Sequence, residues 1–357
     1  MVSSRSSFDR KVIAIDGMSG DKAPEVVIKG VSKFSSSNCH FIIFGDEKKL
    51  NSYKYLLPSD LSYEFRHSAD VITHSMETMI ASHAGKNSSM GLSIQSVQSK
   101  ESMAVVSSEN TELYMALAKI ILKTIDGVDR PAIASIIPGK NGRSVCLDLG
   151  ANAECNEKNM VDFAIMGEAL ARSVFNKTNV KVALLNVGSE EAKGNRLVKR
   201  TSEILKKLFK NYVGFVEGDD FGKGNVDVIV TDGFTGNVAL KTIEGTAKYI
   251  VSEMKDALSG GIFSKLGYLL ASSSLLKLKK KMDPRLHNGA ILLGLNGIAI
   301  KSHGNSDEVG FASAIKFTID ILNQDIFSRI REQIDKSKLD GAFCASLLSF
   351  VNTALLI

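Results

Sequence analysis

The 357-residue sequence contains no tryptophan, five prolines and four cysteines. The cysteines are far apart and form no CxxC pair: Cys39, Cys146, Cys155 and Cys344. Zinc sites and disulfide frameworks depend on closely spaced cysteines, so both are disfavoured and the chain suits a reducing cytoplasm. The histidines other than His303 also lack metal-ligand spacing. The sequence therefore predicts no metal ion.

Two familiar nucleotide-binding signatures are also missing, although glycine is frequent at 29 residues. Gly218, Gly222 and Gly224 do not fit G-x-G-x-x-G, and no G-x-x-x-x-G-K-[ST] occurs. We therefore expect neither a dinucleotide-binding fold nor a P-loop, and no cofactor. The net charge of +5 is mild, and it does not by itself indicate a nucleic-acid partner.

Long apolar runs are scarce as well. The N-terminal MVSSRSSFDRK lacks the apolar core of a secretory signal. No run of about 18 residues is free of polar breaks, so a membrane-spanning helix is not expected. Residues 341–357 come closest, but Ser346, Ser349 and Asn352 favour a packed C-terminal helical tail over membrane insertion.

The sequence does contain a regular alternation of strand and helix patterns. Near-continuous apolar runs predict buried strands at 11–15, 40–44, 103–106, 144–147, 180–185 and 226–231. An amphipathic helix is predicted over 242–258, with one face formed by Ile243, Ala247, Ile250, Val251, Met254 and Leu258. This alternation indicates an α/β protein with a mostly parallel, doubly wound sheet. Because ligands gather outside the carboxyl ends of such strands, we expect the polar, glycine-bearing turns there to meet at one rim.

Segment 226–245 carries the clearest of these turns. Its apolar strand stops at Asp232-Gly233, and a helical pattern begins just past Gly236-Asn237. Unpaired N–H groups and the positive end of a helix dipole meet at such a point, which suits an anion such as phosphate. With Asp232, Asn237 and Lys241 the segment predicts one wall of an active site. The alternatives are that Asp232 caps the helix and that Lys241 lies on a solvated face.

Between residues 15 and 307 the chain carries, in order, IDGMSGDKAPE, KNSSM, DRPAIAS, LDLGAN, NVGSEEAKGN, DGFTGNVALKTIEG and LLGLNGIAIKSHGNSD. Together these motifs resemble the bacterial phosphate acyltransferases, the acyl-carrier-protein:phosphate transacylases of phospholipid synthesis. The resemblance implies a three-layer αβα fold, like that of the isocitrate and isopropylmalate dehydrogenases, in a single domain over 1–340. It also implies a homodimer in the cytoplasm, peripherally associated with the inner face of the membrane.

The resemblance further implies a reaction. A fatty acyl group would move from the thioester of acyl carrier protein to inorganic phosphate, and a membrane glycerol-3-phosphate acyltransferase would use the acyl phosphate. Phosphate is already a nucleophile and a thiolate leaves readily (thiol pKa about 8.5), so no acyl-enzyme is expected. Two rival interpretations remain open: a phosphotransacetylase acting on short-chain acyl-CoA, and a catalytically weakened homologue that acts at the membrane.

The site must hold phosphate, stabilise an oxyanion and exclude water. The predicted catalytic residues carry charge or donate hydrogen bonds: Asn186, Lys193, Asp232, Asn237, Lys241 and His303. His303 would protonate the departing sulfur or bind phosphate. The predicted substrate and phosphate ligands are Asp16, Gly20, Asp21, Ser88, Ser89, Asn110, Thr111, Gly188, Gly236, Asn296 and Lys301. Of these, the three glycines are expected just before helix N-termini whose N–H groups bind phosphate.

Residues 258–284 are apolar first and lysine-rich afterwards. We predict a protruding amphipathic helical element that contacts an anionic membrane or the acidic carrier protein. Its contact residues would be Ile262, Phe263, Leu266, Leu269, Lys277, Lys279 and Lys280. The alternative is a helical pair that packs against the other subunit of a dimer.

One loop departs from the family pattern. Where the family has SAGNTGA or SSGNTGA, this chain has Ser107-Ser108-Glu109-Asn110-Thr111-Glu112-Leu113. Two glycines are thus replaced by Glu109 and Glu112, and two carboxylates near phosphate should repel it. Three consequences are open: a rearranged loop, glutamates that point to solvent, or reduced activity.

Overall fold

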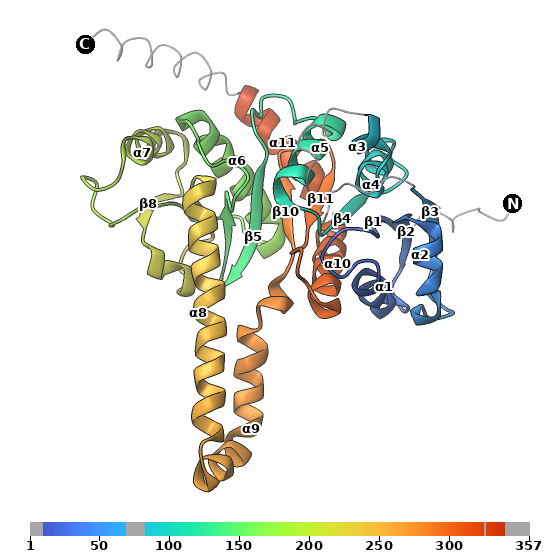
Figure 1. Ribbon diagram of the computed structural model, residues 1–357. Helices are drawn as coiled ribbons and strands as arrows, with labels where there is room; N and C mark the ends of the chain where they lie inside the picture. Colours follow the sequence, from blue (N-terminus) through green and yellow to red (C-terminus); the bar gives the residue numbers. More distant parts are fainter. Residues whose placement is uncertain (1–9, 69–82, 325, 340–357) are drawn as a thin grey trace, which may run out of the picture.

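Eleven strands form one continuous sheet in the computed structural model, which describes residues 10–68, 83–324 and 326–339 (Figure 1). The strands are β1 (Lys11–Asp16), β2 (Cys39–Gly45), β3 (Tyr63–His67), β4 (Ala104–Ser107), β5 (Ala132–Pro138), β6 (Arg143–Leu147), β7 (Val182–Leu185), β8 (Tyr212–Val216), β9 (Val228–Val230), β10 (Ala290–Leu293) and β11 (Ile298–Lys301). Their order is β3-β2-β1-β4-β11-β10-β5-β6-β9-β7-β8. The six predicted strands are all present, within a few residues of their predicted bounds.

The five strands that the sequence did not predict are β3, β5, β8, β10 and β11. Strands β3 and β8 are the outermost strands of the sheet. They are only partly buried, so their apolar patterns are weak. Strands β10 and β11 form an antiparallel pair inside one apolar stretch, LLGLNGIAIK.

The sheet has two halves that run in opposite directions. Strands β1, β2, β3, β4 and β11 are mutually parallel, and so are β6, β7, β8 and β9. Between them the pairings β11–β10, β10–β5 and β5–β6 are antiparallel. A short connection such as residues 139–142, between β5 and β6, can join only antiparallel strands. The expectation of one common rim is therefore wrong, because the two halves place their carboxyl ends at opposite edges of the sheet.

Helices cover both faces of the sheet. They are α1 (Glu25–Val31), α2 (Glu47–Ser52), α3 (His83–Asn87), α4 (Ser89–Gln98), α5 (Thr111–Leu122), α6 (Glu157–Phe175), α7 (Arg196–Leu208), α8 (Gly233–Ser259), α9 (Ile262–Met282), α10 (Glu308–Asn323) and α11 (Ile326–Leu339). Alternate strand residues point to opposite faces: Ile13 and Ile15 belong to the buried cluster that includes residues of α1, α6, α10 and α11, whereas Ala14 belongs to the cluster that includes residues of α4 and α5. The result is a three-layer αβα arrangement.

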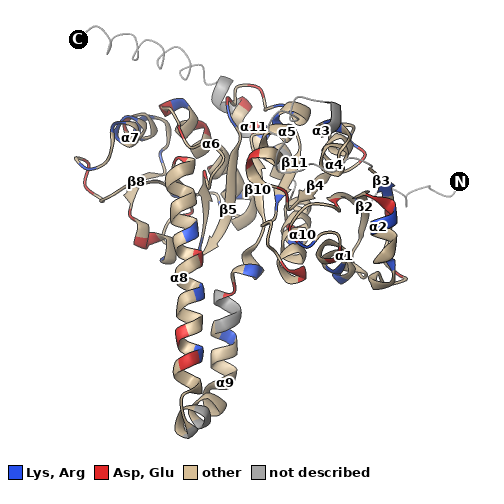
Figure 2. Cartoon of the chain, viewed as in Figure 1, with Lys and Arg blue, Asp and Glu red and all other residues tan. Residues whose placement is uncertain are grey.

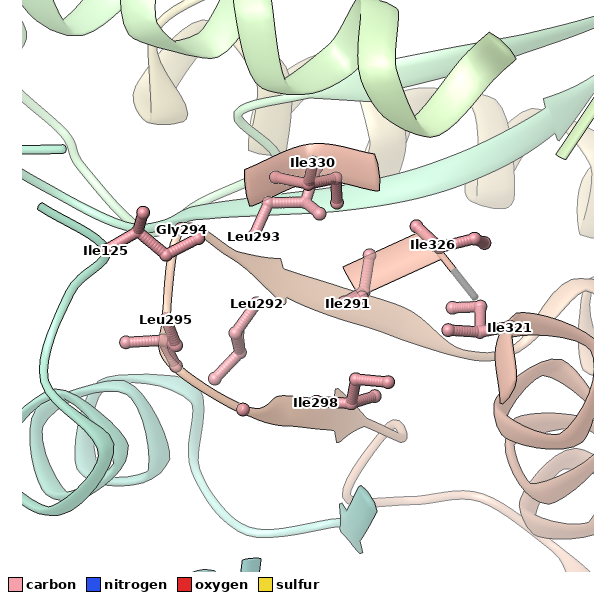
Figure 3. A pocket seen from close by; sticks show the side chains of 11 residues that line it. Ile125, Ile291, Leu292, Leu293, Gly294, Leu295, Ile298, Ile321, Ile326 and Ile330 are labelled. Atoms are coloured by element: carbon pink, nitrogen blue, oxygen red, sulfur yellow. The ribbon is translucent and has the colours of Figure 1, made fainter. Parts of the chain in front are cut away.

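A small cavity lies beside α11, as Figure 3 shows. Ile326 and Ile330 of this helix face Ile291 and Leu293 of β10, and the cavity has a volume of only about 10 Å³. Its lining is apolar and it can hold no substrate, so it is a packing defect between the sheet and α11. The predicted C-terminal tail, 341–357, lies outside the described residues.

Helices α8 and α9 form an antiparallel hairpin that projects away from the sheet (Figure 1). The predicted amphipathic face of α8 is half-buried at Ile243, Ala247, Val251, Met254 and Leu258, whereas Ile250 is exposed. The described part of the hairpin tip shows no blue or red in Figure 2, and between residues 257 and 276 the sequence has one charged residue, Lys265. Among the described residues, no helix has both the length and the hydropathy to cross a membrane.

Candidate active site

The carboxyl ends of β1, β4 and β11 lie side by side at one edge of the sheet. The register pairs Lys301 with Ser107, and the residue before Asp16 pairs with the residue before Ser107. Asp16 is fully buried and accepts hydrogen bonds from Ser107 Oγ at 2.8 Å and from Ser89 Oγ at 2.7 Å. Burial raises the pKa of Asp16, these two hydrogen bonds oppose the rise, and the charge of Glu109 adds to it. Asp16 thus holds three segments together beneath the site surface.

The loops that follow these strands are locked to one another. Gly20 has φ of +95°, and a Cβ there would lie 3.0 Å from the carbonyl oxygen of Gly304. The next residue, Asp21, donates its N–H to that oxygen at 2.9 Å. Ser108 donates its N–H to Ser19 Oγ at 2.9 Å. The loops after β1, β4 and β11 therefore form one rigid floor.

Two predicted ligands of phosphate are helix caps. Ser88 Oγ accepts from the N–H of Gly91 at 3.0 Å and donates to the carbonyl of Gly85 at 2.7 Å. The side-chain oxygen of Asn110 accepts from the N–H of Glu112 at 2.9 Å at the start of α5. Their side chains therefore order α4 and α5. Thr111, the first residue of α5, is half-buried at the same edge of the sheet.

A charged cluster lies where α8 crosses this edge. Glu244 pairs with Lys241 at 3.0 Å and with His303 Nε2 at 3.1 Å. The hydrogen bond from His303, with a further one from Lys241, lowers the pKa of Glu244 to about 2 against the effect of burial. Burial lowers the pKa of Lys301 to about 8, and the neighbouring charge of Lys241 lowers it further while that of Glu109 raises it. The cluster thus brings together three predicted residues, Lys241, Lys301 and His303.

Glu244 was missed by the sequence prediction. It lies in the motif DGFTGNVALKTIEG, three residues after Lys241 and on the same side of the helix. This spacing could have indicated from the sequence that Glu244 pairs with Lys241. Its ion pair with His303 joins α8, which follows β9, to the loop after β11, so only the tertiary structure reveals its partner.

The remaining predicted catalytic residues lie at the opposite edge, at the carboxyl ends of β7 and β9. Asn186 donates its side-chain amide to the carbonyls of Gly188 at 3.0 Å and Lys193 at 3.2 Å. Lys193 pairs with Glu190 at 2.9 Å on the surface. Asn186 therefore shapes its own loop, and both hydrogens of its amide are used there.

The glycines expected before helix N-termini are not in those positions. Helix α1 begins at Glu25 and α7 at Arg196, well after Gly20 and Gly188. Helix α8 begins earlier than predicted, because Asp232 accepts from the N–H of Thr235 at 2.8 Å and from its hydroxyl at 2.8 Å. Gly236 lies inside α8 and donates its N–H to the carbonyl of Asp232 at 2.9 Å. Asp232 is thus an N-cap, and the Gly236 N–H is not free for phosphate.

Helix α8 separates the two groups of predicted residues. At about 1.5 Å per residue, Glu244 lies about 18 Å along the helix from Asp232. Asn237 lies near the Asp232 end, beside Gly150. Asn296 precedes β11, and it is held by the carbonyl of Thr124 at 2.8 Å and by Arg331 at 2.8 Å. The structure therefore does not place Asn186, Asn237 or Asn296 against Lys301.

The described surface also contains a groove. It has a volume of about 470 Å³ and runs between α10, the end of β5 and the end of α6, with Arg143, Lys316 and Asp320 among its lining residues. None of the predicted site residues lines it. The candidate site is the cluster of charged side chains around the largely buried Lys301.

Comparison with known proteins gives the family. A sequence model of the family described as "fatty acid synthesis protein" matches residues 11–329. A phosphate acyltransferase of Rhodospirillum rubrum is 45% identical over 333 residues, covering 91% of this chain and 95% of that protein. One of Pelagibacter ubique is 43% identical, covering 90% and 98%. The chain belongs to the phosphate acyltransferase family.

Solved structures support the fold of this phosphate acyltransferase family member. A phosphotransacetylase from Streptococcus pyogenes aligns with a TM-score of 0.56 at 16% identity, covering 91% of this chain and 94% of that one. A 4-hydroxythreonine-4-phosphate dehydrogenase from Klebsiella pneumoniae aligns with a TM-score of 0.51 at 12% identity, covering 88% and 99%. At these identities the likeness concerns the fold alone. The predicted family and the predicted three-layer, mostly parallel fold are confirmed.

Proposed function

We propose that this chain transfers a fatty acyl group from acyl carrier protein to inorganic phosphate. The observation that carries the proposal is the match of 41–45% identity to phosphate acyltransferases over nearly the whole chain. The edge cluster around Lys301 suits the reaction chemically. It offers two cations for an oxyanion and one titratable imidazole beside them.

The proposed step is a direct displacement. A phosphate oxygen forms a bond to the acyl carbon, the carbon–sulfur bond breaks, and the electron pair leaves with sulfur. Lys301 and Lys241 hold phosphate at the same edge as the N-terminus of α5. Asn110 engages the N–H groups of Glu112 and Leu113 there, so this helix contributes the positive end of its dipole. His303 uses Nε2–H for Glu244. In the imidazolium form it carries a second proton on Nδ1, which passes to the departing thiolate and leaves neutral imidazole.

The test uses purified protein with acyl-acyl carrier protein and phosphate. Acyl phosphate is trapped as a hydroxamate while the free carrier-protein thiol is measured, and the two should appear in equal amounts. Lys301→Met should reduce the rate at least 100-fold, because a buried cation that holds the nucleophile is lost. A matched control is Lys119→Met, on the exposed end of α5, which should keep the wild-type rate.

The rivals give different results in the same assay. A phosphotransacetylase would prefer acetyl-CoA to acyl carrier protein as donor. A weakened homologue would form no acyl phosphate from either. Single-turnover quenching that trapped acyl-protein would contradict the direct displacement. In the proposed function, the acyl phosphate product is the substrate of a membrane glycerol-3-phosphate acyltransferase, which is the downstream partner that we propose.

We also propose a homodimer that forms along α8. Phe234, Val238 and Tyr249 are 68%, 53% and 64% exposed, and their spacing returns them to the side of the helix that faces away from the sheet. A second copy would cover this apolar stripe. Sedimentation should give twice the chain mass of 38.6 kDa. Val238→Glu should give monomers, and Val213→Glu, at an exposed position on β8, should not; a wild-type monomer would refute the dimer.

The proposed location is the cytoplasm, with peripheral contact at the inner face of the membrane. At the tip of the hairpin Phe263 and Leu270 are 86% and 81% exposed, and Leu269 and Lys277 are exposed too. The side chains of the other predicted contacts, Ile262, Leu266, Lys279 and Lys280, lie outside the described residues. Exposed apolar side chains beside lysines suit an anionic bilayer.

Co-sedimentation with phosphatidylglycerol vesicles tests this contact. Phe263→Ser combined with Leu270→Ser should reduce binding several-fold, because the apolar surface that enters the bilayer is removed. Tyr55→Ser removes another highly exposed aromatic ring, in the segment between α2 and β3 and outside the hairpin, and binding should persist. Equal binding by all three proteins would exclude the hairpin as the membrane contact.

A further inference from the structure

Glu109 occupies an unusual place in the candidate site. It follows β4, two residues after Ser107, which is the register partner of Lys301. Its N–H donates to Ser107 Oγ at 3.1 Å, and its Oε1 accepts from the N–H of Asn110 at 2.9 Å. The residue is half-buried. These contacts fix the carboxylate at the site edge and keep it from turning freely into solvent.

The charge of Glu109 affects two other ionisable residues of the site, Lys301 and Asp16. It raises the pKa of Lys301 and contributes to the raised pKa of Asp16, for which burial is the main cause. The other carboxylate of the cluster, Glu244, is engaged by Lys241 and His303. Among the described residues, Glu109 Oε2 has no hydrogen-bond partner and Glu109 forms no ion pair with a lysine, so this oxygen is an acceptor whose charge acts on Lys301 without being paired to it.

A free carboxylate whose charge acts on Lys301 can select among oxyanions. An ionised carboxylate only accepts hydrogen bonds, and it repels an anion that has no proton to donate. Inorganic phosphate near neutral pH retains at least one O–H group, whereas sulfate has none. Sites that contain a hydrogen-bonding group reject analogues that leave this group unpaired, by factors of about 10⁴ in favourable cases.

We propose that Glu109 is a specificity-determining residue, which accepts a hydrogen bond from the protonated oxygen of phosphate and thereby excludes sulfate. This inference rests on the proposed function in one respect, that the surface around Lys301 is the phosphate site. The glutamate that replaces a glycine of the family pattern is then a selectivity device and not a defect. Lys301 and Lys241 supply the attraction, and Glu109 supplies the discrimination.

Calorimetric titration of the full-length protein with phosphate and with sulfate tests the inference without any acyl donor. The wild type should bind phosphate at least 100-fold more tightly than sulfate. In Glu109→Gln the amide can donate to sulfate, so sulfate should bind at least tenfold more tightly and the preference for phosphate should fall by at least the same factor. If that variant does not fold, Glu109→Gly removes the same carboxylate and should give the same loss of preference.

Glu112→Gln is the matched control. Glu112 lies three residues further on, in the first turn of α5, is exposed, and contacts Asn110 through its backbone N–H. Its neutralisation should leave the preference for phosphate unchanged, whereas an equal loss in both variants would indicate general repulsion and overturn the proposal. Lys301→Met should abolish binding of both anions. If it does not, phosphate binds elsewhere and the role of Glu109 is refuted.

The outcomes separate this inference from the proposed reaction. Loss of preference in Glu109→Gln, together with no acyl phosphate formation by the wild type, would sustain the anion selectivity and reject the transferase. If the wild type forms acyl phosphate but binds sulfate as tightly as phosphate, the transferase is supported and the anion selectivity is rejected.

Discussion

Gly236→Ala is the change that tests most directly how the site is assembled. A Cβ at Gly236 would lie 1.9 Å from the carbonyl oxygen of Asp148 and 2.8 Å from Thr231 Cγ2. The loop cannot move easily, because the Asp148 carboxylate accepts N–H groups from Ile133 at 3.0 Å and from Asn152 at 2.7 Å. The start of α8 must therefore shift by roughly 1 Å or more to restore an ordinary contact.

The shift has two measurable costs. Overpacking of this size destabilises by about 1–3 kcal/mol or more, against about 1 kcal/mol that alanine contributes inside a helix. We expect a net loss of about 2 kcal/mol in the free energy of unfolding, measured with urea. Because α8 also carries Lys241 and Glu244, a displacement of about 1 Å should reduce acyl transfer about 100-fold.

Gly267→Ala is the control for this prediction. Gly267 lies inside α9, and no atom lies within 4 Å of the position of an added Cβ. The substitution should stabilise by about 0.5–1 kcal/mol through helix propensity alone and leave acyl transfer in solution unchanged. If Gly236→Ala behaves like Gly267→Ala, the close seating of α8 on the Asp148 loop does not position the site.

Two further predictions concern charge. Glu244→Gln should lower the unfolding free energy by about 1–2 kcal/mol at pH 7, since the depressed pKa reflects ion pairs whose partners are half-exposed. Because the folded pKa, about 2, lies below the ordinary 4.5, this stabilisation is complete above pH 4.5 and is lost towards pH 2. Urea midpoints of both proteins should therefore converge below pH 4.5, and a constant difference down to pH 3 would contradict the ion-pair explanation. Lys301 has a pKa of about 8, so phosphate binding should weaken as the pH rises through 8, where phosphate itself is already a dianion. Lys301→Arg keeps its charge at that pH and should remove the inflection; a wild-type affinity that is flat from pH 7 to 9 would show that Lys301 does not hold phosphate.

Much of this protein follows from local sequence patterns. The buried strands at β1, β2 and β9 are recognisable because consecutive β-branched residues end at glycine or aspartate. The alternation of such runs with amphipathic helices determines the layer class, and the long motifs determine the family. Glu109 and Glu112 are likewise apparent from the sequence alone, because a glutamate at a glycine position departs from a known loop pattern.

The arrangement of the site was decided only by the tertiary structure. Sequence patterns record that a strand ends in polar residues, but they do not record the direction of that strand relative to its neighbours. Three antiparallel pairings reverse the second half of the sheet, so Asn186 and Asp232 lie at one edge and Asp16, Lys301 and His303 at the other. Helix α8 starts at the edge that holds Asp232 and runs to the opposite edge, where its residues Lys241 and Glu244 meet His303. This contact depends on packing between residues far apart in the chain, which no local pattern encodes.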